Sequence, residues 1–312
     1  MFAARCIGIS LAIFLLVYVP LSMAVSRGWK LVFRMVAARS ASLAADLLFL
    51  VRIFPFAVAS IFTLAFTLPS FLLLEPRGTD EAVGLAPTIL GLCCLVLLAA
   101  GMARMASAQL KTRCALKQWL EGSELLERGA AAPVFRTRKS APSLTVAGVR
   151  DPKVLISEAT LAALNRAELR TALRHEMAHV RRYDNLKKLV FRFSAFPGMQ
   201  GLEHQWSEQS ELAADDAAVF NSQEALDLAS ALIKVSRLNC TPRPAVLATG
   251  LLHSSTALNV RVQRLFSWRA SQQSSKYWWY ALPPLAITML LSAAIYPSAL
   301  SRLHMATEWL VR

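Results

Sequence analysis

Hydrophobic positions along the chain fall into four long runs, separated by stretches rich in polar and charged residues. Each run lacks charged residues over a length that suits a helix across a bilayer, for which about 20 apolar residues are needed. The runs cover residues 6–25, 53–74, 82–103 and 277–301. We therefore predict transmembrane helices at about 6–25, 53–74, 82–103 and 278–300.

The segment between the third and fourth runs has the length of one domain. Its pattern begins with an amphipathic helix at 104–128, followed by a linker at 129–143 with one short strand at 134–138. Short β-type runs follow at 144–149 and 154–156, on either side of a turn signal. Helices are expected in the rest of the segment, at 157–164, 165–184, 186–196, about 204–220, 223–238 and 256–268.

These patterns predict a mainly α protein with a small β-sheet. We expect three parts: a membrane region at 1–103, a domain at 104–276, and a fourth transmembrane helix with a short tail at 277–312. The helix that begins after Asn165 has the clearest start signal. Glu168 follows Asn165 at the spacing of a capping box, in which each side chain binds the backbone N–H of the other residue.

The net charge of +14 comes from 34 basic and 20 acidic residues and could indicate a nucleic acid or a membrane surface as partner. Its distribution favours the membrane. Basic residues follow the first and third runs, whereas the loop at 75–81 holds three acids and one Arg. The positive-inside rule then places the N-terminus outside and residues 104–276 in the cytosol. The positive-inside rule and contact with anionic lipid explain the excess of basic residues, so we expect no direct contact with nucleic acid.

The strongest candidate chemistry is the run His175-Glu176-Met177-Ala178-His179 in the middle of the capped helix. Residues four apart lie on the same face of a helix, so both imidazoles can bind one Zn²⁺. Such a metal lowers the pKa of its bound water toward about 7, and Glu176 beside the open position can take the proton. The run predicts a zinc hydrolase site.

A third protein ligand is expected on a later helix. Glu211 follows His179 by 32 residues, and Asp215 lies one turn further on. One ring nitrogen of a metal-binding histidine binds the metal, and Asp215 can accept a hydrogen bond from the other ring nitrogen. Glu208 is a rival ligand. His204 could stabilise an oxyanion, although a surface position is the simpler interpretation.

Other polar residues near the motif are expected to have ordinary roles. The basic residues that flank the helix should contact anionic headgroups or solvent, and recognition of an acidic substrate is the alternative; they are Arg181, Arg182, Lys187, Lys188 and Arg192. Arg261 and Arg264 could supply positive charge to the transition state, but we expect them to face solvent or lipid. The strand at 144–149 is either an ordinary core strand or an edge strand that binds substrate peptide by strand addition.

These motifs resemble the BlaR/MecR-type integral-membrane zinc metallopeptidases. The resemblance is specific from about 140 to 219. It includes Pro-Lys-Val-Leu-Ile-Ser at 152–157, Arg-His-Glu-Met-Ala-His-Val-Arg-Arg-Tyr-Asp at 174–184, and Glu-Leu-Ala-Ala-Asp at 211–215. It implies a gluzincin-like domain in which His175, His179 and Glu211 bind Zn²⁺ and Glu176 is the catalytic base. It also implies the bacterial inner membrane and cleavage of a cytosolic protein, often a transcriptional repressor.

The chain departs from the antibiotic-sensing members, which carry an extracellular penicillin-binding sensor domain after the fourth span. We expect no such domain here, so a signal would enter through the spans, the outer loop or a partner. Two other functions stay open: membrane-protein quality control of the HtpX or CAAX-protease type, and signal transduction without catalysis. The sequence does not decide between a single chain, a homodimer and a complex with a regulatory membrane partner.

Overall fold

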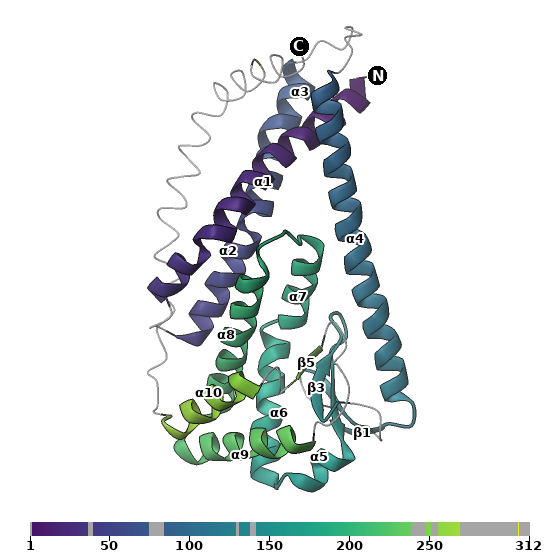
Figure 1. Cartoon of the computed structure of the whole chain (residues 1–312). Helices are drawn as coiled ribbons and strands as arrows, with labels where there is room; N and C mark the ends of the chain where they lie inside the picture. The colour runs from purple at the N-terminus through teal and green to yellow at the C-terminus, as the bar shows by residue number, and fades with distance from the viewer. Residues whose placement is uncertain are drawn as a thin grey trace.

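A computed structural model describes residues 2–36, 40–74, 84–128, 131–137, 142–238, 248–250 and 255–268, together with Met305. Three long helices dominate this part of the chain: α1 (Phe2–Val36), α2 (Ala41–Phe62) and α4 (Leu85–Leu120). They converge at one end and spread apart toward the other, with a domain of shorter elements between and below them (Figure 1). The expectation of a mainly α protein with a small sheet is confirmed.

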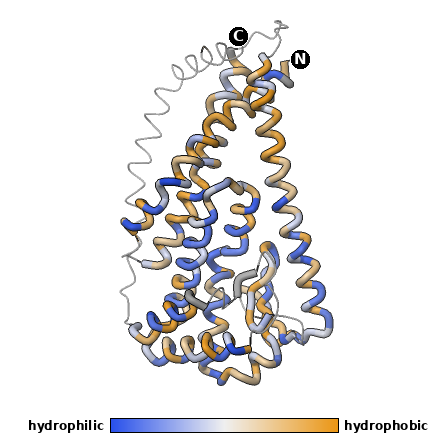
Figure 2. Tube along the Cα trace, viewed as in Figure 1, coloured by the Kyte–Doolittle hydropathy of each residue, from blue (hydrophilic) through white to orange (hydrophobic). Residues whose placement is uncertain are grey.

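The first three predicted membrane spans are found as helices that are long and apolar enough to cross a bilayer. They cover Arg5–Val36, Ala41–Leu73 and Leu85–Leu120, the second continuing from α2 through a π-helical turn, η1 (Thr63–Thr67), into α3 (Leu68–Leu74). Apolar residues concentrate in the upper parts of these helices and polar residues in the lower parts (Figure 2). The fourth predicted span, at about 278–300, lies outside the described residues.

The helices extend beyond the predicted spans at their polar ends. Helix α1 extends to Val36, α2 begins at Ala41, and α4 begins at Leu85 and extends to Leu120. Charged residues end the apolar run without ending the helix, because Lys and Arg are good helix formers. Helices α1 and α2 pack against each other and are here called the membrane hairpin (2–36 and 41–62); their polar ends reach the domain.

The sheet has five strands in the order β1-β2-β4-β3-β5. Strands β2 and β4 are parallel and the other neighbouring pairs are antiparallel. The strands are β1 (Glu124–Arg128), β2 (Pro133–Thr137), β3 (Leu144–Ala147), β4 (Lys153–Ser157) and β5 (Ala248–Gly250). The helix expected to reach residue 128 instead ends at Leu120, shortly before Gly122 adopts a φ of 70°. Glycine tolerates this conformation, which commonly ends a helix.

Strand β3 lies inside the sheet, so the suggestion of an edge strand was wrong for this structure. One of its edges pairs with β4, and the other pairs with β5, where Val146 lies opposite Thr249. The sequence signal was misleading because β5 follows β3 by about 100 residues, and its pairing is a tertiary contact.

Six helices complete the described domain. They are α5 (Glu158–Ala163), α6 (Arg166–Arg181), α7 (Asp184–Phe193), α8 (Gln200–Ala218), α9 (Ser222–Leu238) and α10 (Ser255–Phe266). The capping box of α6 is confirmed: Glu168 N donates to Asn165 Oδ1 and Asn165 N donates to Glu168 Oε2, both at 2.9 Å. A buried core joins α6 and α9 to the sheet, with Ala172, Leu232 and Ile156 all fully buried. This core holds α6 rigidly in the middle of the domain.

The corner between α7 and α8 packs among the membrane helices. Tyr18 Oη of α1 donates to Ser194 O at 3.1 Å, and Arg104 Nε of α4 donates to Arg192 O at 3.3 Å. A Cβ on Gly101 of α4 would lie 2.4 Å from the carbonyl oxygen of Phe193, so only glycine permits this approach. The domain is thus wedged between the membrane hairpin and α4, as Figure 1 shows.

Candidate metal and active site

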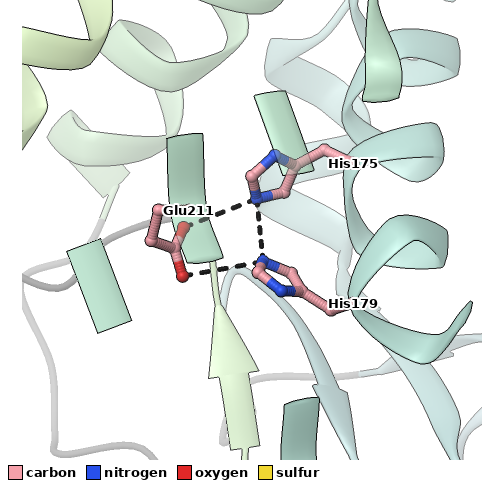
Figure 3. A group of neighbouring side chains, drawn as sticks. All are labelled: His175, His179 and Glu211. Carbon is pink, nitrogen blue, oxygen red and sulfur yellow. Dashed lines mark hydrogen bonds and ion pairs between the residues drawn. The ribbon is translucent and has the colours of Figure 1, made fainter. Parts of the chain in front are cut away.

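The two histidines of the motif lie one turn apart on α6 and face one glutamate on α8. His175 Nε2 and His179 Nε2 are 3.2 Å apart. His175 Nε2 lies 3.5 Å from Glu211 Oε2, and His179 Nε2 lies 3.6 Å from Glu211 Oε1 (Figure 3). All three residues are buried, and one ligand atom from each lies within 4.8 Å of the others. The three side chains point at a common position.

Each imidazole also has a carboxylate on its other nitrogen. His175 Nδ1 lies 2.9 Å from Asp215 Oδ1, and His179 Nδ1 lies 2.7 Å from Asp184 Oδ2. His179 Nδ1 is within hydrogen-bond geometry of Asp184, and His175 Nδ1 lies beside Asp215. A hydrogen on the Nδ1 of each ring, on the side of its carboxylate, leaves the Nε2 lone pair free for a metal. Both rings are therefore oriented as metal-binding histidines are, with Nε2 directed at Glu211.

Asp184 is a site residue that sequence reasoning missed, because it was taken only as the end of the catalytic helix. It is the first residue of α7 and is fully buried. Tyr183 before it has φ 56° and ψ 36°, a left-handed conformation that turns the chain and returns Asp184 toward His179. A signal was present in the sequence: His179 needed a partner like Asp215, and Asp184 is the nearest acid after it.

Glu176 is completely buried, and neither of its carboxylate oxygens has a hydrogen-bond partner among the residues that the structure describes. Burial raises the pKa of Glu176 to about 7, against the lowering effect of His175 and His179. A buried carboxylate without a partner is costly, and such groups are typical of functional sites.

The default expectation for Arg261 of α10, contact with solvent or lipid, was wrong. Arg261 is 4% exposed and belongs to the site, neither solvated nor facing lipid. Its Nε and Nη2 donate to Asp215 at 2.8 and 2.7 Å, and its Nη1 donates to Glu211 Oε2 at 2.9 Å. Burial raises the pKa of Glu211, but His179 and Arg261 outweigh it and hold that pKa well below its ordinary value.

The charges around the two imidazoles favour a bound cation. Four buried carboxylates meet here, and the only buried arginine in contact with them among the described residues is Arg261; the carboxylates belong to Glu176, Asp184, Glu211 and Asp215. Lys188 of α7 is near three of them, and burial lowers its pKa while Glu211, Asp184 and Glu176 oppose that effect. Two imidazoles, one carboxylate ligand and an excess of negative charge suit a divalent metal ion.

Residues 127–265, which contain this whole constellation, match the family model described as BlaR1 peptidase M56. The chain carries an M56 peptidase domain. The resemblance to BlaR/MecR-type membrane metallopeptidases is thereby confirmed. A comparison with curated proteins gave no match.

Two residues considered for the site lie outside the group that converges in the M56 domain. His204 is exposed, with 70% of its side chain accessible, and its Nε2 lies 3.3 Å from Glu208 Oε1 on the same helix. Glu208 also accepts a hydrogen bond from Gln205. The structure therefore does not bring His204 or Glu208 to His175 and His179. On the same helix, α8, Glu211 and Asp215 are the residues that face the two histidines.

The expectation for the basic residues after the motif was only partly right. Arg182 and Lys187 contact Asp46 of α2, and Arg264 forms a two-bond pair with Asp216. Arg181 is exposed and lines a cavity of about 300 Å³ in the M56 domain. His179, Asp184 and Arg150 line the same cavity, which opens beside the candidate metal ligands.

Proposed function

We propose that this chain is a membrane-embedded zinc endopeptidase that hydrolyses peptide bonds of a cytosolic protein. His175, His179 and Glu211 would bind Zn²⁺, and Asp215 would orient His175. The observation that carries the proposal is that both Nε2 atoms face the same buried glutamate while both Nδ1 atoms face separate carboxylates. Ordinary buried histidines have no need of this double arrangement.

Zinc bound there would supply Lewis acidity to the scissile carbonyl and lower the pKa of a water molecule to about 7. The remaining chemistry belongs to side chains of the chain. Glu176 takes a proton from the attacking water and passes it to the leaving amine. Its buried, unpaired carboxylate supports this role, because a site that only held structural zinc would have no use for a base there. This observation disfavours the non-catalytic signal transducer.

The proposed setting is the bacterial inner membrane, with the N-terminus outside and the M56 domain in the cytosol. The basic ends of α1 and α4 lie on the side of the domain, which supports this orientation by the positive-inside rule. A substrate in the cytosol, such as a transcriptional repressor, would reach the cavity beside His179. Reporter fusions at positions 78 and 312 test the orientation, and a cytosolic signal from either would overturn it.

The central experiment compares the full-length wild type with Glu176→Ala, both zinc-loaded in detergent, on a denatured model protein. We expect cleavage by the wild type only, with equal zinc content in both. Equal cleavage by the two proteins would contradict the proposal, as would no cleavage by either when zinc is confirmed.

A second comparison tests the third ligand. Glu211→Gln should lose zinc under mild chelation, whereas Glu208→Gln should keep it. Glu208 is a matched control, because it lies one turn earlier on the same helix and outside the converging group. Loss of zinc from Glu208→Gln alone would show that the ligand is assigned to the wrong residue.

A further inference from the structure

The junction between α6 and α7 holds the second histidine in place and is itself strained. Tyr183 is the one non-glycine residue with positive φ in the described part of the chain, and its side chain is 68% exposed. A left-handed conformation is costly for a bulky residue and persists only where the surrounding structure holds it. The contacts of the neighbouring residues therefore decide where the junction lies.

Two sets of these contacts come from inside the domain. Ser210 Oγ of α8 donates to Asp184 Oδ2 at 2.6 Å, the same oxygen that faces His179 Nδ1. Asn185 Nδ2 donates to the carbonyl oxygens of Val146 and Gly148, at 3.3 and 3.0 Å. The junction is thus tied to α8 and to the end of β3.

The third set of contacts comes from the membrane hairpin. Asp46 Oδ1 of α2 accepts from Arg182 Nη2 at 2.9 Å and from Lys187 Nζ at 3.2 Å. Arg182 Nη1 also donates to Ser42 Oγ at 2.6 Å. Lys187 Nζ in turn lies 3.7 Å from Asp184 Oδ1. A continuous chain of charged contacts therefore runs from α2 through Lys187 and Asp184 to the ring of His179.

Asp46 has an unusual position in the sequence. It is the only acidic residue between positions 1 and 74, and all other charged residues in this stretch are basic. Its side chain is 50% exposed, but those of Arg182 and Lys187 are only 16% and 15% exposed. A half-exposed ion pair adds little to stability by itself, so a pure anchoring role explains poorly why this acid meets both cations of the junction.

We propose that Asp46 is a positioning residue for the metal centre, which fixes the orientation of His179 through Lys187 and Asp184. This inference rests on the proposed metal site, and it makes the membrane hairpin a structural part of that site. A shift of α2 along the domain would move Lys187 and release Asp184, which would change the direction of the His179 lone pair. The partner that orients a metal-binding histidine commonly affects metal affinity by about 10- to 100-fold.

The test is a pair of double-mutant cycles with zinc affinity as the readout. Affinity is measured by chelator competition on the full-length protein in detergent, for Asp46→Asn, Asp184→Asn, Asp215→Asn and the two doubles that contain Asp46→Asn. We expect Asp46→Asn to weaken zinc binding by about threefold to tenfold, and kcat to fall with little change in KM. Asp46→Asn should add nothing further when Asp184 is already Asn.

The Asp215 cycle is the matched control. Asp215 orients His175 from α8, and among the described residues its partners are His175 and Arg261, not Asp46, Lys187 or Asp184. The fold-change caused by Asp215→Asn should therefore multiply with that caused by Asp46→Asn. Asp46→Glu, which keeps the charge, should bind zinc nearly as the wild type does. A protein that is merely less stable would show no difference between the two cycles.

Three results would overturn the proposal. The first is an unchanged zinc affinity in folded Asp46→Asn, and the second is an Asp46→Asn effect on zinc affinity that multiplies with that of Asp184→Asn just as it does with that of Asp215→Asn. The third is no zinc binding by the wild type. If Asp46→Asn does not fold, the same cycles are measured with Lys187→Met, which breaks the chain at its next link. Failure of the peptidase proposal is distinguishable, because a wild type that binds zinc but cleaves nothing still yields both cycles.

Discussion

Arg261 Nη1 donates a hydrogen bond to Glu211 Oε2 at 2.9 Å, across 50 residues of sequence. The same guanidinium binds both oxygens of Asp215. One buried cation from α10 therefore holds the candidate third ligand and the partner of His175 in a single arrangement. Helix α10 thus completes the site that α6 and α8 build.

Removing this cation should damage the site more than removing charge from the surface. Arg261→Met would leave two buried carboxylates without their shared partner, and breaking a buried pair costs about 3–5 kcal/mol. We expect a large fall in the unfolding midpoint and weak zinc binding, measured by thermal unfolding and by zinc content. Arg261→Lys should recover part of both, because Lys keeps the charge but cannot form the forked bonds. Wild-type behaviour of Arg261→Met would contradict this role.

Glu168 should make the domain sensitive to acid. Burial raises the pKa of Glu168, but hydrogen bonds from Lys234, Ser230 and the backbone of Asn165 outweigh it, so the folded-state pKa lies below the ordinary value of 4.5. Ionised Glu168 therefore stabilises the fold above pH 4.5, and this contribution is lost as the pH falls through the folded-state pKa. We expect Glu168→Gln to lower stability by about 2 kcal/mol at pH 7.

The measurement is the free energy of unfolding of wild type and Glu168→Gln between pH 3 and pH 7. The difference between them should shrink on acidification. Glu158→Gln is a suitable control, since its side chain is 55% exposed on the preceding helix α5. A difference that is constant with pH would show that Glu168 acts only through its shape.

Two arginines should give the cavity a preference for acidic substrates. Arg150 and Arg181 are exposed and line the cavity that contains His179. We expect peptides with Glu near the scissile bond to be cleaved faster than the same peptides with Lys, by about fivefold in kcat/KM for each charge, and less so at high salt. Reversing both charges with Arg150→Glu and Arg181→Glu should invert the preference.

Arg166→Glu is the control for this prediction. Arg166 is exposed at the first residue of α6, at the end of that helix away from His179, and does not line the cavity. Its reversal should leave the substrate preference unchanged. Equal effects of all three reversals would point to net charge instead of local recognition.

Gly101 should be intolerant of any side chain. A Cβ there would lie 2.4 Å from the carbonyl oxygen of Phe193, and this backbone atom cannot give way cheaply. Gly101→Ala is expected to push α4 away from α7 and lower the unfolding midpoint of the full-length protein. Gly28→Ala is the matched control in another membrane helix, because a Cβ on Gly28 meets nothing within 4 Å. Equal midpoints for the two variants would disprove the close approach.

Local patterns allowed a good part of the fold to be predicted. The capping box of Asn165 and Glu168 depends on residues three apart, and it formed as expected. The run from His175 to His179 placed both imidazoles on one face because helical periodicity is local. The end of α4 was missed, since the amphipathic pattern continued past the glycine that stops the helix.

The sequence by itself determined which residues could face a metal from α6 and which acids could project together from α8, since both follow from the 3.6-residue turn. Only the tertiary structure brought Asp184 back to His179, inserted Arg261 between Glu211 and Asp215, and set Asp46 against the α6–α7 junction. These contacts join elements between 5 and 141 residues apart. Such pairings are decided by how the helices pack and turn, which no spacing rule within one helix contains.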